Sequence, residues 1–197
     1  MKNYLKDLFD FIVSFFGLIA TWWLILIAWL IASIETKSNG FFIQKRVGRN
    51  GKIFMMVKIK TMKHIEGIDT NITSSSDRRI TKSGKFFRDT KIDELPQLWN
   101  VLKGEMSFVG PRPDVPGYAD RLVGEDRLIL KLKPGITGPA SLKYANEEDL
   151  LSRVDNPVKY NDQIIFPDKV KLNLEYYYNN NFFGDLKFIF RTIYKSN

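Results

Sequence analysis

The sequence predicts an α+β protein in which an N-terminal membrane helix precedes a small, mostly helical domain with one short β-hairpin. Three observations lead to this prediction: an uncharged apolar run near the N-terminus, a Gly-containing turn between two β-rich segments, and helical spacing of apolar residues further along. We expect the boundary after Thr36, which separates a membrane-embedded part, residues 1–36, from a second domain, residues 37–197.

The apolar run spans residues 11–34, reads FIVSFFGLIATWWLILIAWLIASI, and contains no charged side chain. At a rise of ~1.5 Å per residue such a helix would reach ~36 Å, enough to cross a hydrocarbon core of ~30 Å. The run is longer than the apolar part of most signal peptides and is not followed by a cleavage site with small residues. A membrane helix is therefore favoured over a signal peptide and over the buried helix of a soluble protein.

The topology of this helix stays open from the residues alone. Basic residues flank the run on both sides: Lys2, Lys6, Lys37, Lys45, Arg46, Arg49 and Lys52. The positive-inside rule places both flanks in the cytoplasm, which a helix that enters and returns on one face satisfies and a single span does not. Gly17, Thr21 and the pair Trp22–Trp23 lie mid-run and favour a bend there, although no proline marks it.

Residues 41–62 predict a β-hairpin, because the turn sequence Gly48–Gly51 lies between two β-rich flanks. Lys58 and Lys60 are two positions apart and would share one face of the second strand. Residues 63–84 are polar and predict a mobile loop that begins near His64, for which a solvated position is the simplest interpretation.

Residues 92–104 predict a helix with one buried stripe, formed by apolar side chains at helical spacing: Leu95, Leu98, Trp99 and Leu102. Asp93 fits the N-cap or the first turn, and Glu94 follows it. Helix capping alone explains two carboxylates at this place. The same geometry favours an ionised carboxylate, which suits a nucleophile or a metal ligand.

Three further segments carry weaker signals. Arg112 lies between Pro111 and Pro113, which stiffen the backbone around a guanidinium suited to bidentate phosphate binding; an exposed turn is the alternative. Residues 134–141, PGITGPAS, are interpreted as a turn, and residues 145–169 are acidic without catalytic spacing. Residues 182–194 predict an amphipathic helix that lies in the membrane interface or packs on the domain.

Composition excludes several kinds of chemistry. The 197 residues include no cysteine and one histidine, which excludes disulfides, thiolate metal sites and a cysteine nucleophile. Catalysis must use carboxylates, Lys, Arg, hydroxyls or a hard cation such as Mg²⁺. Residues 41–110 carry 14 basic against 7 acidic side chains, within a net charge of +8 for the whole chain. This excess indicates contact with anionic lipid or a phosphate-bearing substrate, and no nucleic-acid-binding motif accompanies it.

Together the segments VKIKTM, KIDELPQLWNVLKGEMSFVGPRP and KPGITGPA, behind the apolar run, resemble the small bacterial sugar transferases, the monotopic phosphoglycosyl transferases. The resemblance covers most of the chain, and its most specific part runs from Ile92 to Pro113. It implies transfer of a phosphosugar from a UDP-sugar to a polyprenyl phosphate such as undecaprenyl phosphate, with release of UMP, as the first membrane step of surface glycan synthesis.

The resemblance also implies roles for individual residues. Asp93 would be the nucleophile that carries a covalent phosphosugar, and Glu94 beside it would bind the required Mg²⁺, so that both belong to the metal site. Arg112 would bind phosphate. Lys58, with Lys60 as a second candidate, and Arg88 would complete the set of binding cations.

For the membrane part, the resemblance implies a re-entrant helix at the cytoplasmic face of the bacterial inner membrane, with both termini in the cytoplasm and anionic lipids as a further partner. Relatives often have Ser-Pro at the bend, where this chain has Thr21-Trp22. Many relatives also continue with Trp-Ala-Gln after ITG, where this chain has Gly138-Pro139-Ala140. The contact made by that part of the loop is therefore not carried over.

Two other functions compete with this enzyme. A non-catalytic adaptor could bind anionic lipid through the basic segment, but it has no need for Asp93, Arg112 and Lys58 together. A lipid-phosphate hydrolase would share the cations but usually needs a histidine or a metal-bound water, and only His64 is available. The sequence names neither the sugar nor an oligomeric state.

Overall fold

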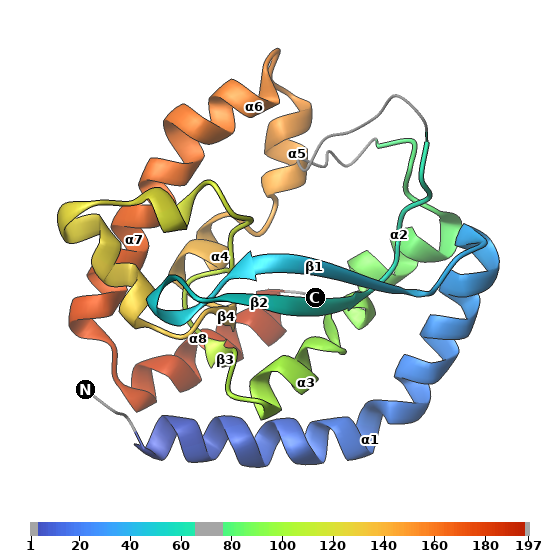
Figure 1. Ribbon diagram of the computed structural model, residues 1–197, viewed down its shortest axis with the longest axis horizontal. Helices are drawn as coiled ribbons and strands as arrows, with labels where there is room; N and C mark the ends of the chain where they lie inside the picture. Colours follow the sequence, from blue (N-terminus) through green and yellow to red (C-terminus); the bar gives the residue numbers. More distant parts are fainter. Residues whose placement is uncertain (1–3, 66–76, 196–197) are drawn as a thin grey trace.

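Helix α1 (Tyr4–Thr36) opens the computed structural model, which describes residues 4–65 and 77–195. Figure 1 shows this helix running along the base of the molecule and then turning to climb one side. No proline lies in α1, and the Thr21 hydroxyl donates a 2.7 Å hydrogen bond to the carbonyl of Gly17. Such hydroxyl bonds accompany helix bending, so the helix changes direction without the Ser-Pro pair.

The side chains of α1 are distributed the opposite way to those of a helix in a soluble protein. Its buried positions are small or polar, namely Asp10, Ser14, Ala28 and Ala32. Large apolar side chains such as Phe16 and Trp22 point outward, with 62% and 61% of their surface exposed. By length and composition this helix is able to cross a membrane. The domain therefore fully buries small and polar positions of α1, while large side chains such as Ile25 and Trp29 are only partly covered.

The predicted hairpin is confirmed. Strands β1 (Phe41–Val47) and β2 (Ile53–Ile59) pair antiparallel, from Phe41 opposite Ile59 to Val47 opposite Ile53, around a 3₁₀ turn at Arg49–Gly51. Phe54 and Met56 on one face of β2 pack with Val101 and Met106 in one core cluster. Ile59, at the end of β2, packs instead with Ala28 and Ala32 of α1 and Phe87.

A second sheet was not expected from the sequence. Strands β3 (Ser107–Val109) and β4 (Gly135–Thr137) pair in parallel. Three residues are too few to show the alternation by which a strand is recognised. The PGITG segment, interpreted as a turn, thus supplies a strand that lies beside the segment leading to Arg112.

Helices form most of the remaining described chain, and Figure 1 shows α4 to α7 gathered on the side away from the climbing half of α1. They are α2 (Lys82–Asp89), α3 (Gln97–Leu102), α4 (Pro139–Lys143), α5 (Glu147–Ser152), α6 (Pro157–Tyr160), α7 (Phe166–Asn179) and α8 (Phe182–Lys195). Short 3₁₀ segments lie at Ile92–Glu94, Ala119–Arg121 and Gly124–Lys131, and a π-helical turn at Asn161–Ile165 precedes α7.

One sequence prediction needs correction at this level, and another is confirmed. The loop expected over 63–84 ends earlier, because Met62 bridges to Ile80 and the Thr81 hydroxyl caps α2 by accepting from the Gly84 N–H; its residues 66–76 lie outside the described chain. The tail does form the expected helix, α8. Its apolar side chains divide between the two surroundings that the sequence left open, since Phe190 is exposed and Leu186 is half-buried.

Candidate active site

The two neighbouring carboxylates lie on a tight turn just before α3, and not at the N-cap or in the first turn of that helix, where they were expected. Lys91 has a left-handed backbone (φ 59°), after which the 3₁₀ turn Ile92–Glu94 carries Asp93 and Glu94. Pro96 caps α3, and no side-chain hydrogen bond caps the helix. A left-handed conformation costs a lysine on the order of 1 kcal/mol. The fold thus tolerates local strain directly before the carboxylates, as is common at functional sites.

The buried stripe predicted for this helix is also wrong in part. Leu98 is buried, but Trp99 is 52% exposed, and Gln97, Asn100 and Val101 are the other buried positions of α3. Two of the four buried positions, Gln97 and Asn100, are polar, so a count of apolar side chains alone places the buried face of this helix wrongly. Asn100 faces the hairpin instead.

Glu94 is held by two cations from distant parts of the chain. One of its carboxylate oxygens, Oε1, accepts a 2.8 Å hydrogen bond from Lys58 Nζ of β2 and a 2.7 Å hydrogen bond from Arg112 Nη2. Burial alone would raise the pKa of Glu94, but the charges of Arg112 and Lys58 outweigh burial and hold it well below its usual range. Glu94 is therefore ionised at any physiological pH.

Asp93 lies in a different environment although it is the next residue. It is 8% exposed, and its Oδ1 atom is buried without a hydrogen-bond partner among the described residues. Burial, together with the charge of Glu94, raises the pKa of Asp93 to about 6. The helix-start argument, which favoured an easily ionised carboxylate here, is thus outweighed by desolvation. An ionised Asp93 near neutral pH would be poorly solvated and hence reactive.

Of the three other cations predicted for the site, the structure brings Lys58 and Arg88 close to the Asp93–Glu94 turn, and it does not bring Lys60 there. Lys58 reaches Glu94, and burial lowers the pKa of its ammonium group. Arg88 is close enough to Asp93 for its charge to act on that carboxylate, but its guanidinium is ion-paired with Glu148 of α5. Lys60 follows the end of β2, and its Nζ donates to the Ser38 hydroxyl at 2.8 Å, so the structure gives it no contact with the carboxylates.

The segment that carries Arg112 is fixed by main-chain contacts with the second sheet. Gly110 N–H donates to Thr137 at 2.9 Å, and Gly135 N–H donates to the Pro111 carbonyl at 2.8 Å. A Cβ atom on Gly135 would lie 2.1 Å from the Gly110 nitrogen, so only glycine permits this approach. The two Gly/Pro segments of the sequence therefore form one unit that holds Arg112 toward Glu94.

Comparison with known proteins identifies the family of the chain. The bacterial sugar transferase family matches residues 1–196. The chain belongs to the bacterial sugar transferase family. The resemblance seen in the sequence is thereby confirmed.

Several relatives carry names that describe a reaction. The chain is 36% identical over 197 aligned residues to the UDP-glucose:undecaprenyl-phosphate glucose-1-phosphate transferase of Klebsiella pneumoniae, covering 96% of this chain and 39% of that protein. It is 35% identical to the uncharacterised sugar transferase EpsL of Bacillus subtilis strain 168, covering 97% and 86%. It is 36% identical to the undecaprenyl-phosphate galactose phosphotransferase of Salmonella typhimurium, covering 78% and 35%. The chain thus spans less than half of the first and third relatives and most of the second.

Sequence reasoning missed a second group of charged residues beside the family's motifs. Arg46 of β1 donates to the Pro113 carbonyl at 2.9 Å, and burial lowers its pKa to about 10. Burial raises the pKa of Asp114 to about 6, against the charges of Lys169 and Arg46. Asp114 could have been found from the sequence, because it directly follows the Pro-Arg-Pro motif. No motif in the sequence marks Arg46 or Lys169. The acidic 145–169 segment, which showed no spacing, provides Glu147 and Glu148.

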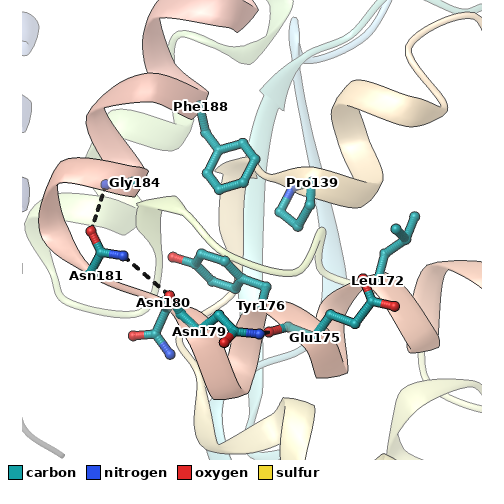
Figure 2. Close-up of a pocket in the computed structure, with 9 residues that line it drawn as sticks. All are labelled: Pro139, Leu172, Glu175, Tyr176, Asn179, Asn180, Asn181, Gly184 and Phe188. Carbon is teal, nitrogen blue, oxygen red and sulfur yellow. Dashed lines mark hydrogen bonds between the residues drawn. The ribbon is translucent and has the colours of Figure 1, made fainter.

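A separate pocket lies away from these carboxylates, at the junction of α4, α7 and α8 (Figure 2). It encloses about 250 Å³, and the rings of Tyr176 and Phe188 meet edge to face beside it. The Asn residues at its rim are engaged with the chain itself; Asn181, for example, accepts from the Gly184 N–H. The pocket therefore belongs to the α7–α8 corner and not to the candidate active site.

Proposed function

We propose that this protein transfers a sugar 1-phosphate from a UDP-sugar to a polyprenyl phosphate, such as undecaprenyl phosphate, and releases UMP. The observation that carries the proposal is the pair of unlike carboxylates: Glu94 is neutralised by Lys58 and Arg112, while Asp93 keeps a buried oxygen that has no hydrogen-bond partner in the described part of the chain. The names of the relatives support the class of reaction.

In the first step, an oxygen of Asp93 attacks the phosphorus that bears the sugar. The bond from that phosphorus to the bridging oxygen breaks, UMP leaves with the bonding electrons, and the phosphosugar stays on Asp93 as an acyl phosphate. In the second step, an oxygen of the lipid phosphate attacks the same phosphorus and frees the Asp93 carboxylate. Neither step needs a histidine or a cysteine, because phosphoryl transfer depends mainly on positioning and charge neutralisation.

Cations of the site would neutralise the phosphates. Arg112 is 46% exposed at the side chain, so it is accessible from outside while Glu94 holds it in place. Lys58 lies deeper, at 16%. The charge of Arg88, five residues before Asp93, reaches that carboxylate and favours its ionised form. Phosphate oxygens prefer such charge-assisted donors, and a guanidinium can offer two of them in parallel.

The carboxylates present fit Mg²⁺. Mg²⁺ in phosphoryl-transfer sites is usually bound by one or two carboxylates together with substrate phosphates, and Asp93 and Glu94 supply two, one with a bare oxygen atom. Among the described residues no third acidic or histidine ligand joins them, so substrate oxygens would complete the set. When bound, the ion would neutralise charge on the diphosphate. A Glu94→Gln variant should need more Mg²⁺ for half-maximal activity than the wild type.

The membrane part of the proposal is a re-entrant α1 at the cytoplasmic face of the bacterial inner membrane, in contact with anionic lipid. Near its start, Asp10 accepts a 3.1 Å hydrogen bond from the Phe108 N–H, and Asp7 pairs with Lys133 at 2.9 Å. At its end, Glu35 accepts from the Ser83 N–H at 3.3 Å. Both ends of α1 are thus tied to the same domain, which supports entry and return on one side of the membrane.

The reaction is tested with purified full-length protein, undecaprenyl phosphate, Mg²⁺ and a panel of UDP-sugars, with UMP release as the readout. We expect UMP with at least one sugar and, without lipid, a phosphosugar adduct on the peptide that contains Asp93. The matched control for Asp93→Asn is Asp89→Asn, an exposed aspartate four residues earlier. Membrane binding without UMP release would indicate the adaptor, and free phosphate from the lipid would indicate the hydrolase.

A further inference from the structure

Helix α5 places two adjacent carboxylates on two cations that come from different parts of the fold. Glu148 is ion-paired with Arg88 of α2, and Glu147 accepts two hydrogen bonds, of 2.8 and 2.6 Å, from Lys169 Nζ of α7. Neighbouring side chains on a helix point in different directions. The two carboxylates therefore bridge the α2 side and the α7 side of the molecule, with α5 between them.

Both of these ion pairs adjoin the candidate active site. Arg88 acts on Asp93, and Lys169 acts on Asp114, which follows the Arg112 segment. The charge of Glu147 reaches Arg112 as well, where it adds to the larger effect of Glu94 in raising the pKa of the guanidinium. The α5 carboxylates are thus ion-paired with two cations whose charges reach the site, Arg88 at Asp93 and Lys169 at Asp114.

The Glu147–Lys169 pair also has a defined setting. Lys169 is 19% exposed at its side chain, and its ammonium lies 5.6 Å from the centre of the Tyr144 ring. Tyr144 is fixed in turn by a 2.7 Å hydrogen bond from its hydroxyl to Asp168. An ammonium group that is held on an aromatic face and donates to a carboxylate is positioned to bind another anion in place of that carboxylate.

We propose that Lys169 is a further phosphate-binding residue of this site, and that Glu147 and Glu148 hold Lys169 and Arg88 until phosphate groups displace them. This inference rests on the proposed function. Phosphate oxygens and carboxylates compete for the same donors, so an anionic substrate that enters must exchange with the α5 carboxylates. Helix α5 then moves away from one or both cations as the substrate binds.

The geometry favours the nucleotide diphosphate over the lipid phosphate as the anion that displaces α5. Figure 1 shows α5 at the opposite end of the molecule from the N-terminal half of α1, which lies along the base. The lipid phosphate is expected at the membrane, beside the exposed apolar face of α1. A soluble diphosphate has no such restriction and can approach from the α5 side.

The proposal is tested by calorimetric titration of the full-length protein with UDP, the part common to all UDP-sugars, in the presence of Mg²⁺. Lys169→Gln should weaken UDP binding by about 10-fold or more, because a charge-assisted contact is lost. Glu147→Gln and Glu148→Gln should tighten it several-fold, because a competing carboxylate is removed. The matched control is Lys143→Gln, whose ammonium lies on the same Tyr144 ring but pairs with Asp168; its affinity should equal that of the wild type.

The lysine and glutamate variants should change UDP affinity in opposite directions, which distinguishes a displaceable contact from a structural one. If the ion pair were only structural, replacing either partner would weaken UDP binding. Equal weakening by Glu147→Gln and Lys169→Gln, or unchanged binding in Lys169→Gln, overturns the proposal. If Lys169→Gln does not fold, the two glutamate variants decide alone. A parallel titration with undecaprenyl phosphate should be unaffected by Lys169→Gln; a loss there and not with UDP overturns the assignment to the nucleotide. Absence of UDP binding by the wild type would instead contradict the proposed function.

Discussion

At the scale of single residues, the site depends on two carboxylates whose environments differ. Glu94 shares one oxygen between Lys58 and Arg112, which keeps it ionised. Asp93 is buried beside that charge, and its pKa is raised to about 6. One carboxylate is thereby fixed as an electrostatic partner, and the other is kept weakly solvated until it reacts.

This difference predicts a pH dependence. Asp93 must be ionised to attack, so kcat/KM for the UDP-sugar should rise up to tenfold per pH unit below about pH 6 and level off above it. Asp114, with a pKa also raised to about 6, titrates over the same range. An Asp114→Asn variant shows which carboxylate controls the pH dependence. If Asp93 controls it, this variant should keep the wild-type pH profile of kcat/KM. A profile that is flat from pH 5 to 8 would contradict the assignment.

Replacing the nucleophile should affect activity and stability in opposite directions. Asp93→Asn removes the attacking oxygen, so UMP release should be abolished. The pKa of Asp93 in the folded protein, about 6, lies above the ordinary value of an aspartate, so its ionised form lowers stability above about pH 6, and this cost disappears as the pH falls toward 4. At pH 7.5 Asp93→Asn should therefore gain on the order of 1 kcal/mol in the free energy of unfolding, measured by denaturant titration. A loss of stability would mean that the carboxylate has a structural role, and Asp89→Asn should leave both quantities unchanged.

Arg112→Lys should be poorly tolerated although the charge is kept. The guanidinium donates to Glu94 through Nη2 and retains further N–H groups for a phosphate. A lysine ammonium is a compact point charge and cannot present two parallel donors to a phosphate. The loss of one charge-assisted bond, about 1.5–3 kcal/mol, corresponds to roughly tenfold to a hundredfold in kcat/KM. Arg121→Lys, at an exposed position, is the control. Unchanged UDP-sugar dependence would return Arg112 to the role of a turn residue.

At the scale of elements, the site is assembled by contacts between β2 and α3. The Asn100 side chain accepts from the Val57 N–H at 3.2 Å and donates to the Met55 carbonyl and to Glu105, each at 2.8 Å. These bonds fix the strand that carries Lys58 against the helix that follows Asp93 and Glu94. Asn100 itself is 1% exposed, so its bonds to β2 lie inside the contact between strand and helix, whereas its third partner, Glu105, is 26% exposed at the side chain and also pairs with Lys103.

Asn100→Ala should therefore destabilise the fold by about 2–3 kcal/mol, since it leaves buried polar groups of β2 unpaired. Activity should fall more than the fraction of folded protein, because Lys58 loses its register with Glu94. Denaturant unfolding measures the first effect and UMP release under folding conditions the second. Lys103→Ala, at an exposed position at the end of α3, is the control, and its free energy of unfolding should stay within about 0.5 kcal/mol of the wild-type value. An Asn100→Ala protein as stable as that control would show that α3 and β2 are held by apolar packing alone.

At the scale of the whole molecule, local patterns were sufficient for α1, the hairpin and α8, each of which is long or has an unambiguous turn. They failed for β3 and β4, where three residues carry no period, and for α3, where polar Gln97 and Asn100 are buried while Trp99 is exposed. The contact of Glu94 with Lys58 and Arg112 joins positions 36 and 18 residues apart, and no spacing rule connects them. The family resemblance identified these three residues, but it did not indicate Glu147, Glu148 or Lys169.

The topology of α1 is the prediction that involves the entire molecule. Charged residues near the start of α1 are bound to the domain, and Glu35 near its end is bound to α2, so both ends should lie on the cytoplasmic side. A straight span would have to break the contacts at one end, which would separate Asp7 from Lys133 and Asp10 from the Phe108 N–H. Because the chain has no cysteine, single substitutions report without background. Tyr4→Cys and Ser38→Cys flank the helix; in intact cells a membrane-impermeant thiol reagent should label neither, and after lysis it should label both. Labelling of the Tyr4 position in intact cells would show that α1 spans the membrane and that the contacts of Asp7 and Asp10 do not form there.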